Sequence, residues 1–308
     1  MKVSIVGGGG RVGSDAAFAL QITGIVREIA LVDANADMAA GEALDLRHGA
    51  SLVGGQTFTS GDYGVVEGSD CVVITAGLRR KPDESRLDLI NRNVGLFKGI
   101  VDELKKVKLP DSATVLVVSN PVDILTFLAI QSGILPPRQV IGLGTVLDTA
   151  RFRALLADRL KVNALDVKAL ILGEHGDSMV PIWSSATVGG AAIATAPGYS
   201  QAFGEEVFAA TKTSGAEVIR QKGGAGRAVG MSIAEVVNAM ALDNGRVLTV
   251  SAIQQGALGV NDVSYSLPTV VGRRGAVQVW EPAVSDAERD GLVKSAQSLK
   301  DTWAQVQA

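Results

Sequence analysis

"KVSIVGGGGRVG", residues 2–13, joins a short apolar run to four consecutive glycines. Residues 2–6 are typical of a strand that is buried on both faces inside a parallel sheet. The residues that follow place apolar side chains on one face of a helix, namely Val12, Ala16, Ala19 and Leu20. The stretch therefore predicts a strand, a tight glycine turn and a helix.

The glycine turn has the spacing of a dinucleotide-binding loop. Gly7, Gly10 and Gly13 fit one such spacing, and Gly8, Gly10 and Gly13 fit G-x-G-x-x-G. Glycine lets the backbone turn tightly and approach a pyrophosphate, whose charge then lies at the helix N-terminus. Taken alone, the run equally fits a plain strand-to-helix turn, and that alternative stays open at this point.

Asp33 favours the dinucleotide interpretation. It ends the next apolar run, 28–33, and stands 20 residues after Gly13. A carboxylate there can accept hydrogen bonds from both ribose hydroxyls, and its charge would repel a 2′-phosphate. We therefore expect NAD rather than NADP, with the candidate cofactor residues Gly7, Gly8, Gly10, Arg11, Val12, Gly13 and Asp33.

The pattern changes about halfway along the chain. Before that point, buried strands alternate with helices, with strands at 28–33, 71–77 and 113–120 and helices at 35–48 and 87–107. After 139–144 we expect helices near 148–160, 200–221, 228–243 and from 285, and strands around 167–172, 180–194, 246–253 and 263–280. The fold class is α/β: an N-terminal doubly wound parallel sheet, 1–145, followed by a C-terminal α+β domain, 146–308.

The composition narrows the class of protein. The chain has 308 residues, 47% of them apolar and 20% charged, with a net charge of −3. This balance does not favour a polyanionic partner, so we expect no nucleic acid. The single cysteine, Cys71, excludes a disulfide within the chain, and the longest uncharged stretch is broken by prolines. We expect a cytoplasmic protein without a membrane partner and without a metal.

One of the two histidines lies in an unusual setting. His175 stands in "ILGEHGDSMV", 171–180, between two acids and two glycines. Histidine exchanges protons near neutrality, and a carboxylate on its far nitrogen would fix the tautomer. Asp148 is a candidate for that carboxylate. A lone histidine is more often structural, which is how we interpret His48, expected to be buried or at a subunit contact.

Two groups of arginines are candidates for binding an anion. "LRRKPDESR", 78–86, follows a buried strand, and its Arg80 and Arg86 could each grip a carboxylate in a two-pronged contact. The alternative is a solvated basic loop. Arg151 lies three residues after Asp148, hence on the same helix face, and the alternative there is a simple surface ion pair.

Taken together, these motifs resemble the family of NAD-dependent L-lactate and L-malate dehydrogenases. The resemblance runs from the glycine loop through "DCVVITAGLRRKP", "VVSNPVDILT", "GLGTVLDTARFR" and "GEHGDSMVP" to "KGGAGRAVGMSIAEVV" and covers nearly the whole chain. It implies a Rossmann NAD-binding domain, an oxidoreductase activity on a small 2-hydroxy acid, and a homotetramer or homodimer.

The resemblance also implies a role for each candidate residue. His175 looks like the proton acceptor for the substrate hydroxyl, with Asp148 as its partner. Arg151 resembles the arginine that binds the substrate carboxylate, and Arg86 the loop arginine that closes over the substrate. Asn120 resembles the asparagine that hydrogen-bonds the reacting oxygen, in a cis Asn120-Pro121 peptide, and Asn93 one near cofactor and substrate.

Substrate choice is implied by Arg80. Malate enzymes typically carry arginine at this position and lactate enzymes glutamine, because a second carboxylate needs a partner. This favours L-malate dehydrogenase, an enzyme of the tricarboxylic acid cycle acting on a dicarboxylate. "ESRLDL" and "GTVLDTARFR" look more like lactate dehydrogenase, so L-lactate or a broader range of 2-hydroxy acids is the alternative.

Two alternatives come from other classes of protein. One is an NAD-dependent glycosidase, which would need a Cys/His metal site, and the other is a non-catalytic NAD sensor.

Overall fold

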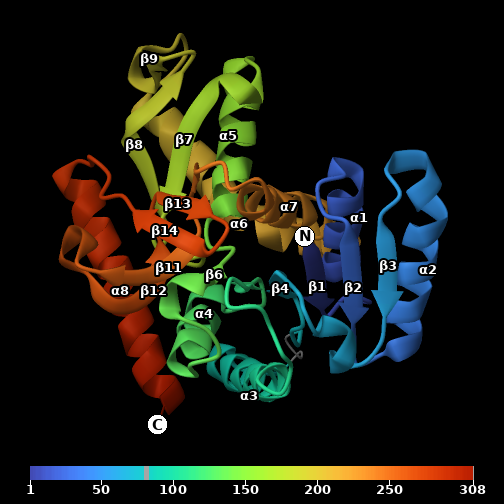
Figure 1. Cartoon of the computed structure of the whole chain (residues 1–308). Coiled ribbons are helices and arrows are strands. Elements are labelled where there is room, and N and C mark those ends of the chain that lie inside the picture. The colour runs from blue at the N-terminus through green and yellow to red at the C-terminus, as the bar shows by residue number, and fades with distance from the viewer. Residues whose placement is uncertain (80–82, 308) are drawn as a thin grey trace.

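The computed structural model describes residues 1–79 and 83–307. The opening stretch forms the expected unit, with β1 (Lys2–Val6), the glycine turn, α1 (Arg11–Thr23) and then β2 (Glu28–Val32). β1 and β2 pair in parallel (Figure 1), so α1 is a crossover helix between them.

The central sheet has eight strands in the order β12-β11-β6-β5-β4-β1-β2-β3. From β1 the chain runs outward first through β2 to β3 (Thr57–Ser60), then returns to build the other side with β4 (Cys71–Ile74), β5 (Thr114–Val117) and β6 (Val140–Gly142). These six strands are parallel. The expected doubly wound α/β sheet is confirmed.

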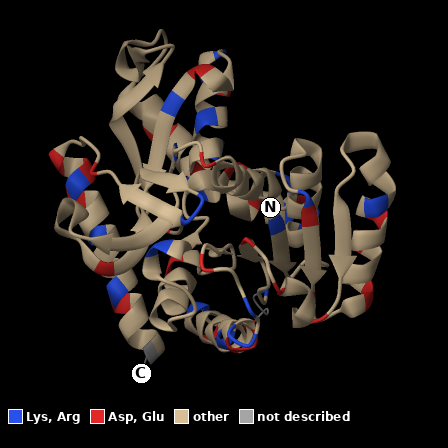
Figure 2. Cartoon of the chain, in the orientation of Figure 1, with Lys and Arg blue, Asp and Glu red and all other residues tan. Residues whose placement is uncertain are grey.

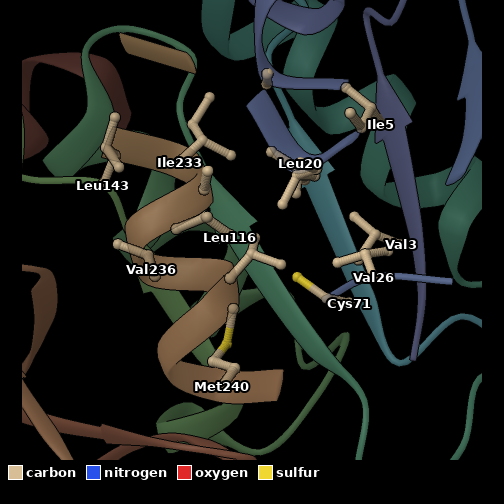
Figure 3. Packing of buried hydrophobic residues seen from close by; sticks show 14 of the residues in the cluster. Val3, Ile5, Leu20, Val26, Cys71, Leu116, Leu143, Ile233, Val236 and Met240 are labelled. Atoms are coloured by element: carbon tan, nitrogen blue, oxygen red, sulfur yellow. The ribbon is translucent and has the colours of Figure 1, made fainter. Parts of the chain in front are cut away.

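Helices cover both faces of this sheet. In β4, Cys71 and Val73 point into one apolar cluster, and Val72 and Ile74 into the other. The strand is apolar throughout because neighbouring residues face opposite sides and neither side meets water. Figure 3 shows the first cluster, where Cys71 and Leu116 lie against α7. This cluster contains residues of α1, α2 (Ala36–Val53) and α7 (Arg227–Leu242). The cluster on the other face contains residues of α3 (Arg86–Leu104) and α4 (Val122–Gln131).

The second half is mixed, as expected. Its remaining elements are α5 (Val146–Leu160), β7 (Val167–Leu172), β8 (Val180–Val188), β9 (Ala191–Ala192), α6 (Gln201–Lys222), β10 (Arg246–Leu248), β11 (Ser251–Gln255), β12 (Asn261–Ser266), β13 (Thr269–Gly272), β14 (Gly275–Val279) and α8 (Asp286–Gln307). Two small antiparallel sheets, β7-β8-β9 and β10-β13-β14, belong to this half alone.

One feature of the second half was not expected. β11 and β12 do not join either small sheet but extend the central one, through an antiparallel contact between Ser251 and Gly142 of β6. The strand expected at 246–253 is therefore two strands in two different sheets, because the chain leaves one sheet after β10 and enters another at β11.

The surface agrees with the small net charge. Acidic and basic residues are interspersed on the outer helices α2, α3, α5 and α8 (Figure 2). The expectation that His48 is buried within the chain is wrong, because it lies exposed on α2. No helix among the described residues combines the length and the apolar character that crossing a membrane requires.

Candidate active site

The glycine turn is packed too tightly for side chains. Gly7 has a φ of +91°, and a Cβ atom on Gly13 would lie 2.2 Å from the carbonyl oxygen of Gly7. The N-terminus of α1 has no side-chain cap and no acidic residue in its first turn. A glycine loop whose backbone can approach closely, leading into a helix with no acidic residue in its first turn, has the features that a pyrophosphate needs, so the loop fits NAD.

Asp33 lies beside this loop. Its carboxylate accepts hydrogen bonds from the backbone N–H groups of Gly9 and Asn35, each at 3.0 Å. The side chain is half-buried, so it remains open to a ligand. Arg11 is occupied otherwise: its guanidinium donates to the carbonyl oxygens of Lys222 and Gly224. Arg11 and Val12 can therefore contribute to cofactor binding through their position in the first turn of α1.

His175 and Asp148 form a close pair. His175 lies in the turn between β7 and β8, Asp148 in the first turn of α5, and the ring Nδ1 is 2.5 Å from the carboxylate Oδ2. Burial lowers the pKa of His175, but the carboxylate of Asp148 outweighs burial and raises it above its ordinary value. Burial likewise opposes the charged form of Asp148, and His175 and Arg151 reverse this, leaving the pKa of the carboxyl lowered.

Arg151 joins the pair from the next turn of α5. Its guanidinium lies 3.2 Å from Asp148 Oδ1. The surface ion pair that the sequence left open as an alternative is not what forms, because Asp148 is 1% exposed. The structure thus brings a proton-exchanging ring, its carboxylate and a fixed cation together.

The two asparagines lie at the same edge of the sheet. Asn120 follows β5 and is joined to Pro121 by a cis peptide bond, as expected. Its Oδ1 accepts the N–H of Val122 at 3.3 Å. Asn93, buried in α3, accepts the N–H of Leu78 at 2.7 Å and so anchors the segment that leaves β4.

Arg86 pairs with acidic residues of the His175 turn and forms no hydrogen bond with His175 in the described part of the chain. It is the first residue of α3, whose N-cap, Ser85, forms a capping box with Asp88. The guanidinium pairs with Asp177 and, at 3.7 Å, with Glu174, both on the turn that carries His175. These groups line a cavity of about 430 Å³ between the start of α3, this turn and α8. Arg80, the expected selector of substrate, lies outside the described residues.

Several residues that hold the His175 turn were missed in the sequence. Asp123 accepts the backbone N–H of His175 at 2.8 Å, and Ser295 of α8 accepts that of Glu174 at 2.8 Å. Lys212 of α6 donates to the carbonyl oxygen of Asp177. Asp123 stands in the motif "VVSNPVDILT", which could have pointed to it, whereas the other two come from helices with no such motif.

A doubly wound sheet with a glycine turn, an acid after its second strand and a histidine–carboxylate pair defines an NAD-dependent oxidoreductase acting on a CH–OH group. Comparison with known proteins agrees. Residues 1–142 match the family model described as lactate/malate dehydrogenase, NAD binding domain, and residues 145–308 match that of the lactate/malate dehydrogenase alpha/beta C-terminal domain. The chain belongs to the lactate/malate dehydrogenase family and is a 2-hydroxyacid dehydrogenase of that family.

Similar proteins carry lactate dehydrogenase names. L-lactate dehydrogenase 1 of Clostridium acetobutylicum is 40% identical over 306 residues, 98% of this chain and 97% of that protein. L-lactate dehydrogenase of a Synechococcus species is 41% identical and covers 97% of each. The crystal structure of the minor L-lactate dehydrogenase from Enterococcus mundtii superposes with a TM-score of 0.95 at 35% identity, over 99% of this chain and 98% of that one.

The NAD-dependent glycosidase, one of the two alternatives from other classes, finds no support. A glycosidase of the expected kind would need a cluster of metal-binding side chains. Within residues 1–79 and 83–307, no three histidine, cysteine, aspartate or glutamate side chains come together in that way. Cys71 is fully buried in β4, where burial raises the pKa of its thiol to about 12.

Proposed function

We propose that His175 takes the hydroxyl proton of an L-2-hydroxy acid while Asp148 holds its ring in the required tautomer. The observation that carries this proposal is the 2.5 Å contact between His175 Nδ1 and Asp148 Oδ2. With Nδ1 held by the carboxylate, Nε2 is the atom left for the substrate. The carboxylate also stabilises the imidazolium that forms.

NAD, bound at the glycine turn and Asp33, supplies the hydride acceptor. Arg151 holds the substrate carboxylate, because its guanidinium is fixed on α5 beside the reacting ring. Asn120 hydrogen-bonds the reacting oxygen. In the reverse reaction, Arg86 polarises the carbonyl of the oxo acid. To reach it, Arg86 must leave Asp177, a movement that would also carry the start of α3 and close the site.

L-lactate is the leading candidate substrate. Relatives of about 40% identity over nearly their full length are named L-lactate dehydrogenase. L-malate is the second candidate, and the observation that favours it is Arg80 in the loop 78–86. A guanidinium there would pair with the second carboxylate of a dicarboxylate, which pyruvate and lactate lack.

Steady-state rates with NADH and either pyruvate or oxaloacetate separate the two substrates. A preference for pyruvate supports lactate, and a preference for oxaloacetate supports malate. Arg80→Gln should lower kcat/KM for oxaloacetate relative to pyruvate by roughly 10-fold or more if Arg80 is the selector. An unchanged ratio would show that it is not.

The catalytic assignment is tested by His175→Asn, with His48→Asn as the matched control. The first should lower kcat by at least ~100-fold and the second should leave it unchanged, because only one of the two rings is near the site. Full turnover in His175→Asn would overturn the mechanism. No turnover in the parent protein with either oxo acid would favour a non-catalytic NAD sensor.

We also propose a homotetramer or homodimer. Large apolar side chains are exposed on three helices that pack in one apolar cluster against the central sheet: Phe18 and Ile22 on α1, Leu44 and Leu52 on α2, and Met231 on α7. Side chains of this kind are commonly covered in an assembly. Sedimentation equilibrium measures the state directly, and a monomer at micromolar concentration would contradict the proposal.

A further inference from the structure

Asp123 is a buried carboxylate that the proposed mechanism does not use. It lies in the first turn of α4, immediately after Asn120 and the cis peptide, and is 2% exposed. Its Oδ2 accepts the backbone N–H of His175 at 2.8 Å, across 52 residues of sequence. Its Oδ1 has no hydrogen-bond partner among the described residues.

The unpartnered oxygen argues for a role beyond that of a tether. Burying a carboxylate is costly unless its charge is used, and a neutral amide could accept the same N–H at a lower cost. What the carboxylate adds is negative charge. Asp123 lies close enough to the imidazole to raise the pKa of His175, in the same direction as Asp148 but more weakly.

We propose that Asp123 is a positioning residue for the dehydrogenase: it holds the main chain of His175 and places a second carboxylate beside the imidazole, which stabilises the imidazolium. This inference rests on the proposed function of His175. Asp148 acts through the ring Nδ1, whereas Asp123 acts through the backbone and through space. His175 itself is therefore held at two points by different elements, its ring by α5 and its backbone by α4.

The charge of Asp123 is itself sensitive to its surroundings. Burial raises the pKa of its carboxyl to about 7. This rise is opposed by His175 and by the nearby hydroxyl of Ser251 on β11, which has no hydrogen-bond partner of its own among the described residues. Glu174, on the same turn as His175, raises it further. The groups that face the His175 ring are Asp148, Asp123 and Arg151. Asp123 and His175 therefore each favour the charged form of the other.

The test is the pKa of the His175 ring, measured by NMR on protein labelled at histidine Cε1. The chain has two histidines, so His48→Gln assigns the signals. Asp123→Asn keeps the size of the side chain and an acceptor for the N–H but removes the charge. The imidazolium then loses a neighbouring negative charge, so we expect the ring pKa to fall by about one unit. In the direction that reduces the oxo acid, the pH at which kcat/KM declines should fall by the same amount.

Asp70→Asn is the matched control. Asp70 Oδ2 also accepts a backbone N–H, that of Lys2, at 2.8 Å, but at the opposite end of β1 from the glycine turn. This substitution should leave both the ring pKa and the pH profile unchanged. A second variant, Ser251→Ala, removes the hydroxyl that favours the charged form of Asp123 and should shift the ring pKa in the same direction by a smaller amount.

Folded Asp123→Asn with the ring pKa and pH profile of the parent would overturn the proposal. If Asp123→Asn does not fold, the decision passes to Ser251→Ala, where an unchanged ring pKa overturns it equally. The NMR titration needs no turnover. A parent protein without dehydrogenase activity but with the expected shift would therefore reject the proposed function and leave the electrostatic role of Asp123 standing.

Discussion

The contact between His175 and Asp148 makes the imidazolium a stable species in a nearly buried site. Its pKa is raised because Asp148 outweighs the cost of burial. A raised pKa means that the ring holds its proton to higher pH, and the reduction of an oxo acid needs that proton. The strength of this pair should therefore appear directly in the rate and in its pH dependence.

Asp148→Asn is the first prediction. It leaves Arg151 without its carboxylate and lowers the ring pKa, so we expect kcat for oxo-acid reduction to fall between ~100-fold and ~10,000-fold at pH 7. The decline of kcat/KM with pH should begin at lower pH than in the parent protein. Stopped-flow rates from pH 5 to 9 measure both effects, and Asp70→Asn serves again as the control. Parent-like rates would show that the pair is structural.

Gly13 gives the second prediction. A Cβ atom at this position would lie 2.2 Å from the Gly7 carbonyl oxygen, which is backbone and cannot move aside cheaply. Gly13→Ala should therefore displace the glycine turn and raise the Kd for NADH by more than ~10-fold, as measured by fluorescence titration. Gly99→Ala in α3 is the control, because nothing lies within 4 Å of its Cβ position. Equal affinity in both variants would mean that the turn does not bind the cofactor.

For single residues, the sequence was informative where chemistry depends on short spacing. Asp148 and Arg151 lie on one helix face because they are three apart, and the glycines and Asp33 follow from a fixed strand–turn–helix order. The pairing of Arg86 with Asp177 could not be foreseen, because the two are 91 residues apart and meet only where α3 begins beside the His175 turn.

The elements that hold this turn come from several parts of the chain, and α8 is one of them. Ser295 accepts a hydrogen bond from the turn, and Glu288 accepts the N–H groups of Trp183 and Ser184 on β8. Glu288 also closes the N-terminus of its own helix by accepting the N–H of Ser285, the residue just before α8 begins. One carboxylate therefore fixes both the start of α8 and its contact with β8.

The third prediction concerns that carboxylate. Burial raises the pKa of Glu288, but the hydrogen bonds from Ser184 and Ser285 outweigh it, so the folded pKa is lowered from 4.5. A group with a lowered folded pKa stabilises the protein above its unfolded pKa and loses this effect as the pH falls through the folded value. Glu288→Gln should thus lower the free energy of unfolding by about 1 to 2 kcal/mol at pH 7.

The same variant should match the parent protein once the pH is well below 4.5, the ordinary value for this carboxyl. Urea unfolding at several pH values measures this convergence. Glu205→Gln, on the exposed face of α6, is the control and should leave stability unchanged at every pH. A difference that is independent of pH would assign the effect of Glu288 to packing rather than to charge.

At the element scale, the parallel strands could be predicted because a strand buried on both faces is a continuous apolar run. β11 could not be placed in the same way. Its first residue, Ser251, pairs with Gly142 of β6, more than 100 residues earlier, and nothing in the pattern of its five residues distinguishes a strand of the central sheet from one of the small sheets. Long-range pairing depends on the whole fold rather than on local sequence.

For the whole molecule, this pairing joins the two halves. We keep 1–145 and 146–308 as the proposed domains, yet β11 and β12 of the second complete the sheet of the first. Trp303 of α8 packs edge-on against Phe127 of α4, with ring centroids 5.0 Å apart. Apolar contacts and a shared sheet across the proposed boundary favour a single cooperative unfolding unit over two independent ones.

The fourth prediction follows from the positions of the three tryptophans. Trp183, Trp280 and Trp303 all lie in the second half, whereas the glycine turn and Asp33 lie in the first. NAD⁺ at 100 times its Kd should raise the free energy of unfolding by about 2.7 kcal/mol. If the halves unfold together, tryptophan fluorescence must report this full increase although all three tryptophans lie in the other half of the chain. The unfolding transition seen by fluorescence must also coincide with the transition seen by circular dichroism. Gly13→Ala should show a smaller increase at the same NAD⁺ concentration, because its affinity is reduced. A tryptophan transition that does not move with NAD⁺ in the parent protein, while circular dichroism shows a second transition that does, would mean that the shared sheet does not couple the halves.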